Sequence, residues 1–182
     1  MAPDLGEFLA RHTPVGEASA VWGGGTLPLR VAGYVGDEVP PLAYITSVRG
    51  LVFRADSVLV LRNADGIFHL LPGGRREAGE SLPETLRREV LEETGWLVDI
   101  GPMVGFIHFH HLSPKQPGYG FPHPDFISVI HGSEAVAYRP EAMLSDDYEL
   151  EAAFRTIDEA RALPLEVESR LYLEAALRAR GR

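Results

Sequence analysis

One stretch, residues 73–96, constrains this chain more than any other part of its sequence: GGRREAGESLPETLRREVLEETGW. Ser81 and Glu84 have the Ser-x-x-Glu spacing of a helical capping box, and Pro83 falls in the first turn, where its missing N–H costs little. Gly95 stands where a helix C-terminal cap is expected. The pattern predicts one helix that begins after Ser81 and ends at Gly95.

Three glutamates share a face of this predicted helix, because Glu89, Glu92 and Glu93 follow the i, i+3, i+4 spacing. On a helical wheel they border the apolar stripe, whereas a solvated acidic patch would lie opposite it. The apolar stripe consists of Leu82, Leu86 and Val90. The solvent side of the helix carries Glu84, Arg87, Arg88 and Leu91. Carboxylates crowded beside a low-dielectric surface repel one another, so the arrangement indicates a bound cation. Mg²⁺ prefers oxygen ligands of this kind.

The rest of the chain alternates between strand-like and helix-like segments. A hairpin is predicted from residues 47–53 and 57–62, followed by a turn at 63–66 and an extended segment at 67–71. Two β-rich segments, 97–112 and 125–138, flank a proline-rich loop at 113–124. Helices are expected at 4–11, 157–162 and 165–180. Most of the remainder of residues 1–44 is expected to form loop or edge strand. This alternation predicts an α/β or α+β domain in which helices cover a mixed sheet.

Composition limits the classes of function. The length of 182 residues suits one domain, and we expect residues 1–44 to form an N-terminal extension packed on the domain of residues 45–182. The chain has no cysteine, which excludes disulfides, thiolate metal sites and cysteine nucleophiles, and is compatible with a cytoplasmic location. A formal net charge of −9 argues against a long nucleic-acid partner, although bound cations would still admit a small anionic substrate. No signal peptide or membrane span is expected, and therefore no membrane partner.

The same segment resembles the signature of the Nudix hydrolases. Gly74, Glu80 and the run REVLEETGW that begins at Arg88 match every fixed position of that signature, with Trp96 where an aliphatic residue is usual. Leu71-Pro72-Gly73 and the segment 154–159 also resemble the family. The resemblance covers about residues 47–163 and implies an α/β fold: an α/β/α sandwich with a mixed β-sheet and a catalytic loop-helix-loop.

The resemblance also assigns roles to particular residues. It implies that Glu89, Glu92 and Glu93 act in catalysis and bind Mg²⁺ or Mn²⁺ together with the backbone carbonyl of Gly73. It implies that Glu80 pairs with Arg88 and does not bind metal. The expected reaction is attack of water on a phosphorus of a nucleoside diphosphate linked to another group. A further catalytic acid is expected outside the signature, with Glu149 the first candidate, followed by Asp147 and Glu151.

Substrate contacts are expected next to the signature and in the proline-rich loop. Arg75 could contact phosphates, and Tyr119 and Phe121 could close over a base or sugar; a plain connecting loop is the alternative. His108 and His110 alternate on one strand, with His111 and His123 nearby. Metal or phosphate binding by these histidines is open, but ordinary partly buried histidines are the preferred interpretation.

Three functions other than the expected hydrolysis are disfavoured by the sequence. Isopentenyl diphosphate isomerisation relies on a cysteine that this chain lacks, and the charge disfavours RNA decapping. A non-catalytic nucleotide-binding sensor with the same fold is the alternative, and it is disfavoured because all the glutamates of the signature are present. The substrate stays open among ADP-ribose, nucleoside triphosphates, dinucleoside polyphosphates and nucleotide sugars. A homodimer formed through residues 1–44 also stays open.

Overall fold

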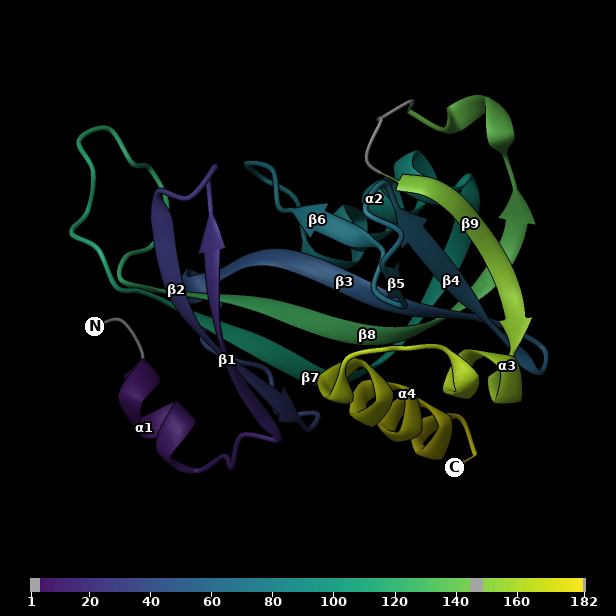
Figure 1. Cartoon of the computed structure of the whole chain (residues 1–182), viewed down its shortest axis with the longest axis horizontal. Helices are drawn as coiled ribbons and strands as arrows, with labels where there is room; N and C mark the ends of the chain where they lie inside the picture. The colour runs from purple at the N-terminus through teal and green to yellow at the C-terminus, as the bar shows by residue number, and fades with distance from the viewer. Residues whose placement is uncertain (1–3, 145–148, 182) are drawn as a thin grey trace.

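The computed structural model describes residues 4–144 and 149–181, without the side chains of residues 149, 150 and 167. In this part of the chain, nine strands form one mixed sheet, flanked by helices (Figure 1). The helical segments are α1 (Leu5–Ala10), η1 (Leu42–Tyr44), α2 (Leu82–Thr94), η2 (Pro140–Ala142), α3 (Ile157–Ala162) and α4 (Val167–Arg180). The strands are β1 (Gly16–Trp22), β2 (Leu27–Val35), β3 (Ile45–Arg54), β4 (Ser57–Asn63), β5 (Phe68–His69), β6 (Gly73–Arg75), β7 (Trp96–His111), β8 (Asp125–Tyr138) and β9 (Glu149–Thr156).

The sheet is mixed because β3 runs parallel to β8, whereas the other described pairs are antiparallel. The strand order is β1-β2-β7-β8-β3-β4-β5, with β9 paired to β4. The short strand β6 pairs with β3 over Ser47 to Arg49. This pairing brings the segment that precedes α2 against β3 in the interior of the sheet.

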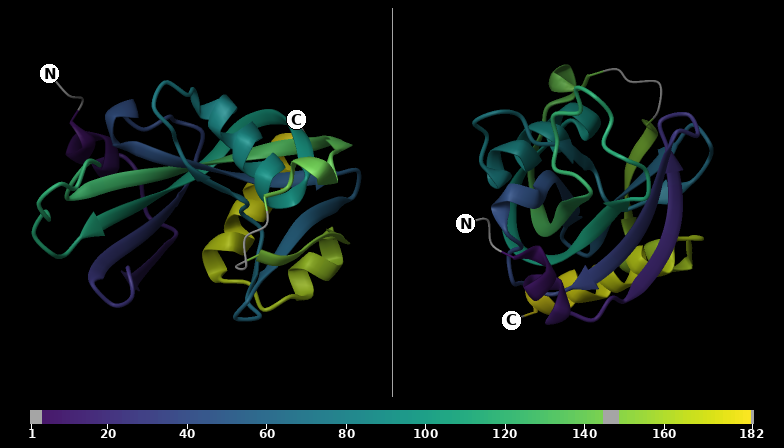
Figure 2. Two further views of the ribbon diagram at one scale, coloured as in Figure 1. Left: turned by 90° about the horizontal axis from the view of Figure 1, so that it is seen from above. Right: turned by 90° about the vertical axis from the view of Figure 1, so that its left-hand side faces the viewer.

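Helices cover both faces of the sheet, as the two views in Figure 2 show. The side chains of β3 alternate between the two layers, as expected of a strand buried on both sides. Val52 belongs to the cluster that contains Leu86 of α2, whereas Leu51 packs in the cluster that contains Tyr172 of α4. The layered arrangement agrees with the predicted sandwich.

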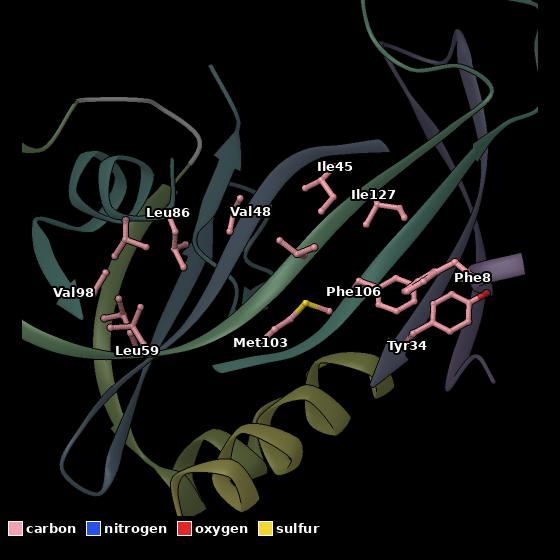
Figure 3. Packing of buried hydrophobic residues seen from close by; sticks show 14 of the residues in the cluster. Phe8, Tyr34, Ile45, Val48, Leu59, Leu86, Val98, Met103, Phe106 and Ile127 are labelled. Carbon is pink, nitrogen blue, oxygen red and sulfur yellow. The ribbon is translucent and has the colours of Figure 1, made fainter. Parts of the chain in front are cut away.

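The core on the α2 side extends from Leu86 across the sheet to Phe8 of α1 (Figure 3). Tyr34 of β2 stacks on Phe106 of β7 with ring centroids 4.6 Å apart, and Phe8 packs against the same ring at 5.4 Å. The helix of residues 5–10 and the hairpin of residues 16–35 therefore share a core with the rest of the sheet.

Residues 1–44 contain more regular structure than the sequence suggests. Glycines at positions 23, 24 and 25 form the turn of a β1–β2 hairpin, and β2 pairs with β7 from Leu29 to Val35. The prediction of mostly loop or edge strand was right for β1 and wrong for β2. Its Pro28 and Gly33 weaken the local strand signal, and pairing with β7 supplies the order instead. The division of the chain at residue 44 stays a prediction.

Elsewhere the local signals located the elements correctly. The hairpin of β3 and β4, the two long strands β7 and β8, and the helices α1, α3 and α4 lie where they were expected, to within a few residues. None of the helices in the described part of the chain has the length and apolar character needed to cross a membrane.

Candidate active site

Helix α2 is fixed at both ends by the residues that predict it. The hydroxyl of Ser81 accepts a hydrogen bond from the Glu84 N–H, and the Glu84 carboxylate accepts one from the Ser81 N–H at 2.8 Å. Gly95 adopts the left-handed conformation, with φ of 72°, and its N–H donates to the Leu91 carbonyl. The predicted helix is confirmed, and both of its ends carry the expected caps.

The three glutamates lie at the border of the buried face, as the helical wheel predicts. Leu86 and Val90 are fully buried, whereas the Glu89 and Glu92 side chains retain 15% and 31% of their exposure. Glu93 is also partly buried. Carboxylates in such positions are partly desolvated, so their mutual repulsion must be offset by a positive partner.

Arg88 is that partner, which corrects its expected place on the solvent side. Its guanidinium bends across the helix, where Nη1 lies 2.8 Å from Glu89 Oε1 and 3.2 Å from Glu92 Oε2. Its Nε and Nη2 make a bidentate pair with Glu80 at 2.7 and 2.9 Å. The wheel gave the direction of Cβ, but a side chain as long as arginine can return toward a local negative charge.

The pairing of Glu80 with Arg88 confirms the role expected for Glu80 as an anchor of the loop. Its carboxylate also accepts hydrogen bonds from the Thr85 hydroxyl and the Glu77 N–H, both at 2.9 Å. The hydrogen bonds from Arg88 are the main cause that lowers the pKa of Glu80 to about 2. The same pairing raises the pKa of Arg88, so both groups stay charged. Thr85 is a contributor that the sequence interpretation missed.

Two glycines of β6 complete the surroundings of the carboxylates. Gly73 has a φ of 133°, and its N–H donates to Glu93 Oε2 at 2.8 Å. A Cβ atom at Gly74 would lie 2.5 Å from Glu89 Oε2. The absence of a side chain at Gly74 therefore leaves the space that the Glu89 carboxylate occupies.

The oxygen atoms gathered here suit a hard divalent cation, since Mg²⁺ favours carboxylate and carbonyl ligands. In the described residues, no three Asp, Glu or His side chains already converge as a metal-binding group. The reason is visible in the contacts: Arg88 draws Glu89 and Glu92 to itself, and the Gly73 N–H holds Glu93. The side chains fit a cation if Nη1 of Arg88 releases its two carboxylates.

Comparison with protein families identifies a NUDIX domain at residues 43–176, which is most of the chain. The chain belongs to the Nudix family. The match includes β6, α2 and the loop between them, so the helix that carries the glutamates is the signature helix of a Nudix domain.

Two curated relatives resemble this Nudix domain over shorter segments. YjhB of Bacillus subtilis (strain 168), provisionally named an ADP-ribose pyrophosphatase, is 35% identical over 71 residues, which cover 38% of this chain and 34% of that protein. A MutT-like protein of Streptomyces ambofaciens is 46% identical over 68 residues, covering 36% of this chain and 43% of that protein. The matched segments thus span less than half of either relative.

Solved structures share the fold. A NUDIX hydrolase from Nitrosomonas europaea aligns with a TM-score of 0.55 at 23% identity, over 74% of this chain and 88% of that chain. An ADP-ribose pyrophosphatase from Streptococcus suis aligns with a TM-score of 0.53 at 18% identity, over 77% of this chain and 93% of that one. These likenesses confirm the expected α/β fold with its mixed sheet.

Trp96, the one unusual residue of this Nudix signature, has a packing role. Its ring lies 5.0 Å from the Tyr138 ring and 5.2 Å from the Phe154 ring, measured between centroids. The Arg54 guanidinium sits 5.2 Å from the Trp96 ring and 4.3 Å from the Phe154 ring. The aromatic residue, which follows α2, therefore contacts β8, β9 and the end of β3.

The residues expected to contact substrate lie together beside the signature loop. The Arg75 guanidinium sits 4.4 Å from the Phe121 ring centroid, and the Tyr119 ring packs edge-on to Phe121 at 5.6 Å. The Tyr119 hydroxyl is 3.1 Å from Nε2 of His111. The proline-rich loop thus reaches β6. Its role in binding substrate stays a prediction.

The acid outside the signature remains a prediction as well. Glu149 opens β9 opposite Asn63, but its side chain is outside the described residues, as is the whole of Asp147. Glu151 is held by Arg62 at 3.3 Å and by Arg155 at 3.0 Å. These ion pairs make Glu151 the weaker candidate.

The histidine pair on β7 has a partner that the sequence interpretation missed. Nε2 of His108 and Nδ1 of His110 lie 2.8 and 2.7 Å from the same oxygen of Asp125. Asp125 opens β8 directly opposite His110, so the antiparallel register explains the contact. That register, and hence the pairing, was not available from sequence patterns alone.

Proposed function

We propose that this chain is a Mg²⁺-dependent Nudix hydrolase that cleaves the diphosphate bond of a nucleoside diphosphate linked to another group. Glu89, Glu92 and Glu93, with the carbonyl of Gly73, would hold the cation, and Mn²⁺ would serve in place of Mg²⁺. The support comes from the family and from the contents of the site. One relative and one similar structure are named as ADP-ribose pyrophosphatases, and we extend pyrophosphatase activity to this chain.

One observation carries the proposal: three carboxylates crowd at the border of a buried helix face, next to Gly74, whose missing side chain leaves room for the Glu89 carboxylate. A purely structural acidic face would be exposed, and here Arg88 is needed to offset the charges. When bound, the cation would neutralise phosphoryl oxygens and lower the pKa of the attacking water. Positioning is most of what the protein must add.

The chain's own residues would divide this positioning between them. Arg88 and Glu80 fix the loop to α2 through their bidentate pair, and the Gly73 N–H orients Glu93. Arg75, Tyr119 and Phe121 would contact the substrate next to the loop. Glu149 would take the proton of the attacking water as the anhydride P–O bond breaks.

The test is hydrolysis of a panel that contains ADP-ribose, nucleoside triphosphates, dinucleoside polyphosphates and nucleotide sugars. Released phosphate is measured after coupling to a phosphatase, with Mg²⁺ and then with excess chelator. We expect turnover of one class with Mg²⁺ and none in chelator. Turnover in chelator would refute the metal mechanism, and nucleotide binding without turnover would identify the sensor.

Glu93→Gln and Glu84→Gln are matched variants of the same helix. Glu93→Gln removes a ligand charge and should lower turnover by orders of magnitude. Glu84 lies on the exposed side, and glutamine also satisfies a capping box, so Glu84→Gln should change turnover little. Equal losses in both variants would mean that the assignment of the helical face is wrong.

A further inference from the structure

A recess of about 340 Å³ lies beside the signature loop. Its walls come from η1, from the start of β3, from the loop after β6 and from the proline-rich loop. Its lining includes Leu42, Ile45, Arg76, Glu77, Phe121 and Pro122. Other recesses of the described residues border α4 instead.

A short path of contacts joins the recess to the carboxylates. Phe121 covers the Arg75 guanidinium, and the carbonyl of Arg75 accepts a hydrogen bond from Arg88 Nη2 at 3.0 Å. The Arg88 guanidinium also holds Glu89 and Glu92. A ligand whose phosphates reach these carboxylates would therefore place the rest of its structure at the recess.

The wall formed by the signature loop is held in place by backbone hydrogen bonds. The Arg76 N–H donates to the Thr46 carbonyl at 2.9 Å, and the Glu77 N–H donates to the Glu80 carboxylate. At the rim of the recess, Glu77 is exposed and Arg76 is partly buried. The recess thus has a fixed polar edge with one positive and one negative group.

The rest of the lining of the recess is apolar and includes an aromatic ring. Leu42 is 57% exposed, and Ile45 anchors the floor of the recess in the core. Phe121 and Pro122 face them from the proline-rich loop. An apolar slot with an aromatic side and a few polar groups at the rim suits a flat heterocycle whose N–H groups can reach a carboxylate.

We propose that this recess binds the nucleobase of the substrate, with the base against Phe121 and its N–H groups at Glu77. The inference rests on the proposed function, since that function supplies a nucleotide next to the loop. A nucleobase fits better than the sugar or phosphate at the other end of such a substrate, because only the base has a π face to stack on an aromatic ring.

The test measures binding without metal, so that catalysis does not enter. AMP and ribose 5-phosphate are titrated into the protein in excess chelator by calorimetry, and GMP and UMP follow. We expect AMP to bind at least about tenfold more tightly than ribose 5-phosphate, in line with the contribution of one stacked base. Equal affinities, or no AMP binding at millimolar concentration, would overturn the proposal.

Variants on opposite walls locate the site. Phe121→Ala and Leu42→Asp should each abolish the preference for AMP, and Leu42 is exposed enough that the fold should tolerate the change. Lys115→Ala, an exposed position in the same loop, is the control and should retain it. Unchanged AMP binding in both wall variants would refute the site even if the protein hydrolyses nucleotides. Base-dependent binding in a protein that hydrolyses nothing would instead refute only the proposed function.

Discussion

Substitution of either adjacent glycine of β6 by alanine should have a different consequence: a loss of stability at Gly73 and a loss of metal affinity at Gly74. In Gly73→Ala, the new Cβ would lie 2.8 Å from the Cα of Arg49 and closer still to the carbonyl oxygen of Val48, whereas real Cβ contacts essentially never fall under 3.0 Å. These atoms belong to the backbone of β3, which cannot move aside cheaply. The φ of 133° adds strain of about 1–3 kcal/mol for any residue other than glycine. With the overpacking, we expect a loss of about 2–4 kcal/mol of unfolding free energy, which is roughly 5–15 °C in Tm.

Gly74→Ala meets a different obstacle. Its Cβ would lie 2.5 Å from Glu89 Oε2 and 2.7 Å from Glu89 Cδ, which form the movable end of a side chain. The carboxylate can turn away, so the unfolding free energy in chelator should change by less than about 1 kcal/mol. The displaced carboxylate should weaken Mg²⁺ binding by about tenfold or more, as changes to the support of a metal ligand do.

Melting curves in chelator and Mg²⁺ titrations of both variants separate these effects. The expected result is a large stability loss in Gly73→Ala and a predominant loss of metal affinity in Gly74→Ala. If Gly74→Ala melted as low as Gly73→Ala, or bound Mg²⁺ like the parent protein, then the Glu89 carboxylate would not occupy the space beside Gly74.

Three further predictions concern stability. Ser81→Ala removes the N-cap of α2 and should cost about 0.5–2 kcal/mol without abolishing turnover of the folded protein; a lost activity at unchanged Tm would contradict this. Trp96→Leu restores the usual aliphatic residue but removes two aromatic contacts, so thermal unfolding should show a loss of about 1–3 kcal/mol with turnover retained. Burial lowers the pKa of His111 from 6.5, and Arg88 lowers that of Glu80 from 4.5 to about 2. At acid pH the unfolded chain thus binds more protons at both groups, so stability should fall below pH 6.5 through His111 and again between pH 4.5 and 2 through Glu80. His111→Gln should flatten the dependence of Tm on pH between 8 and 5, and an unchanged slope would refute that assignment.

The parts of the fold that local chemistry determines could be predicted from sequence. The capping box at Ser81, the glycine at position 95 and the apolar spacing of α2 act within a few residues, so they locate the helix without tertiary information. The strand β2 could not be found this way. Its order comes from pairing with β7, more than seventy residues later in the chain, as in the pair Val31 with Phe109.

The same distinction applies to the candidate site. The face shared by Glu89, Glu92 and Glu93 follows from helical geometry, and the pairing of Glu80 with Arg88 followed from the family resemblance. The contact of Asp125 with His108 and His110 depends on the register of two long strands. Similarly, the approach of Phe121 to Arg75 depends on the path of a loop, for which the sequence has no periodic signal.

Arg88 explains how a cluster of carboxylates is held in a folded chain before any cation binds. Its Nε and Nη2 are committed to Glu80, while Nη1 alone spans Glu89 and Glu92. Under the proposed function, a cation that binds the three carboxylates would replace the contacts of Nη1 with Glu89 and Glu92 and the contact of the Gly73 N–H with Glu93. Metal binding would then exchange one positive partner of Glu89 and Glu92 for another. We expect this exchange to leave the signature loop attached to α2, because the bidentate pair of Arg88 with Glu80 involves none of the three proposed carboxylate ligands.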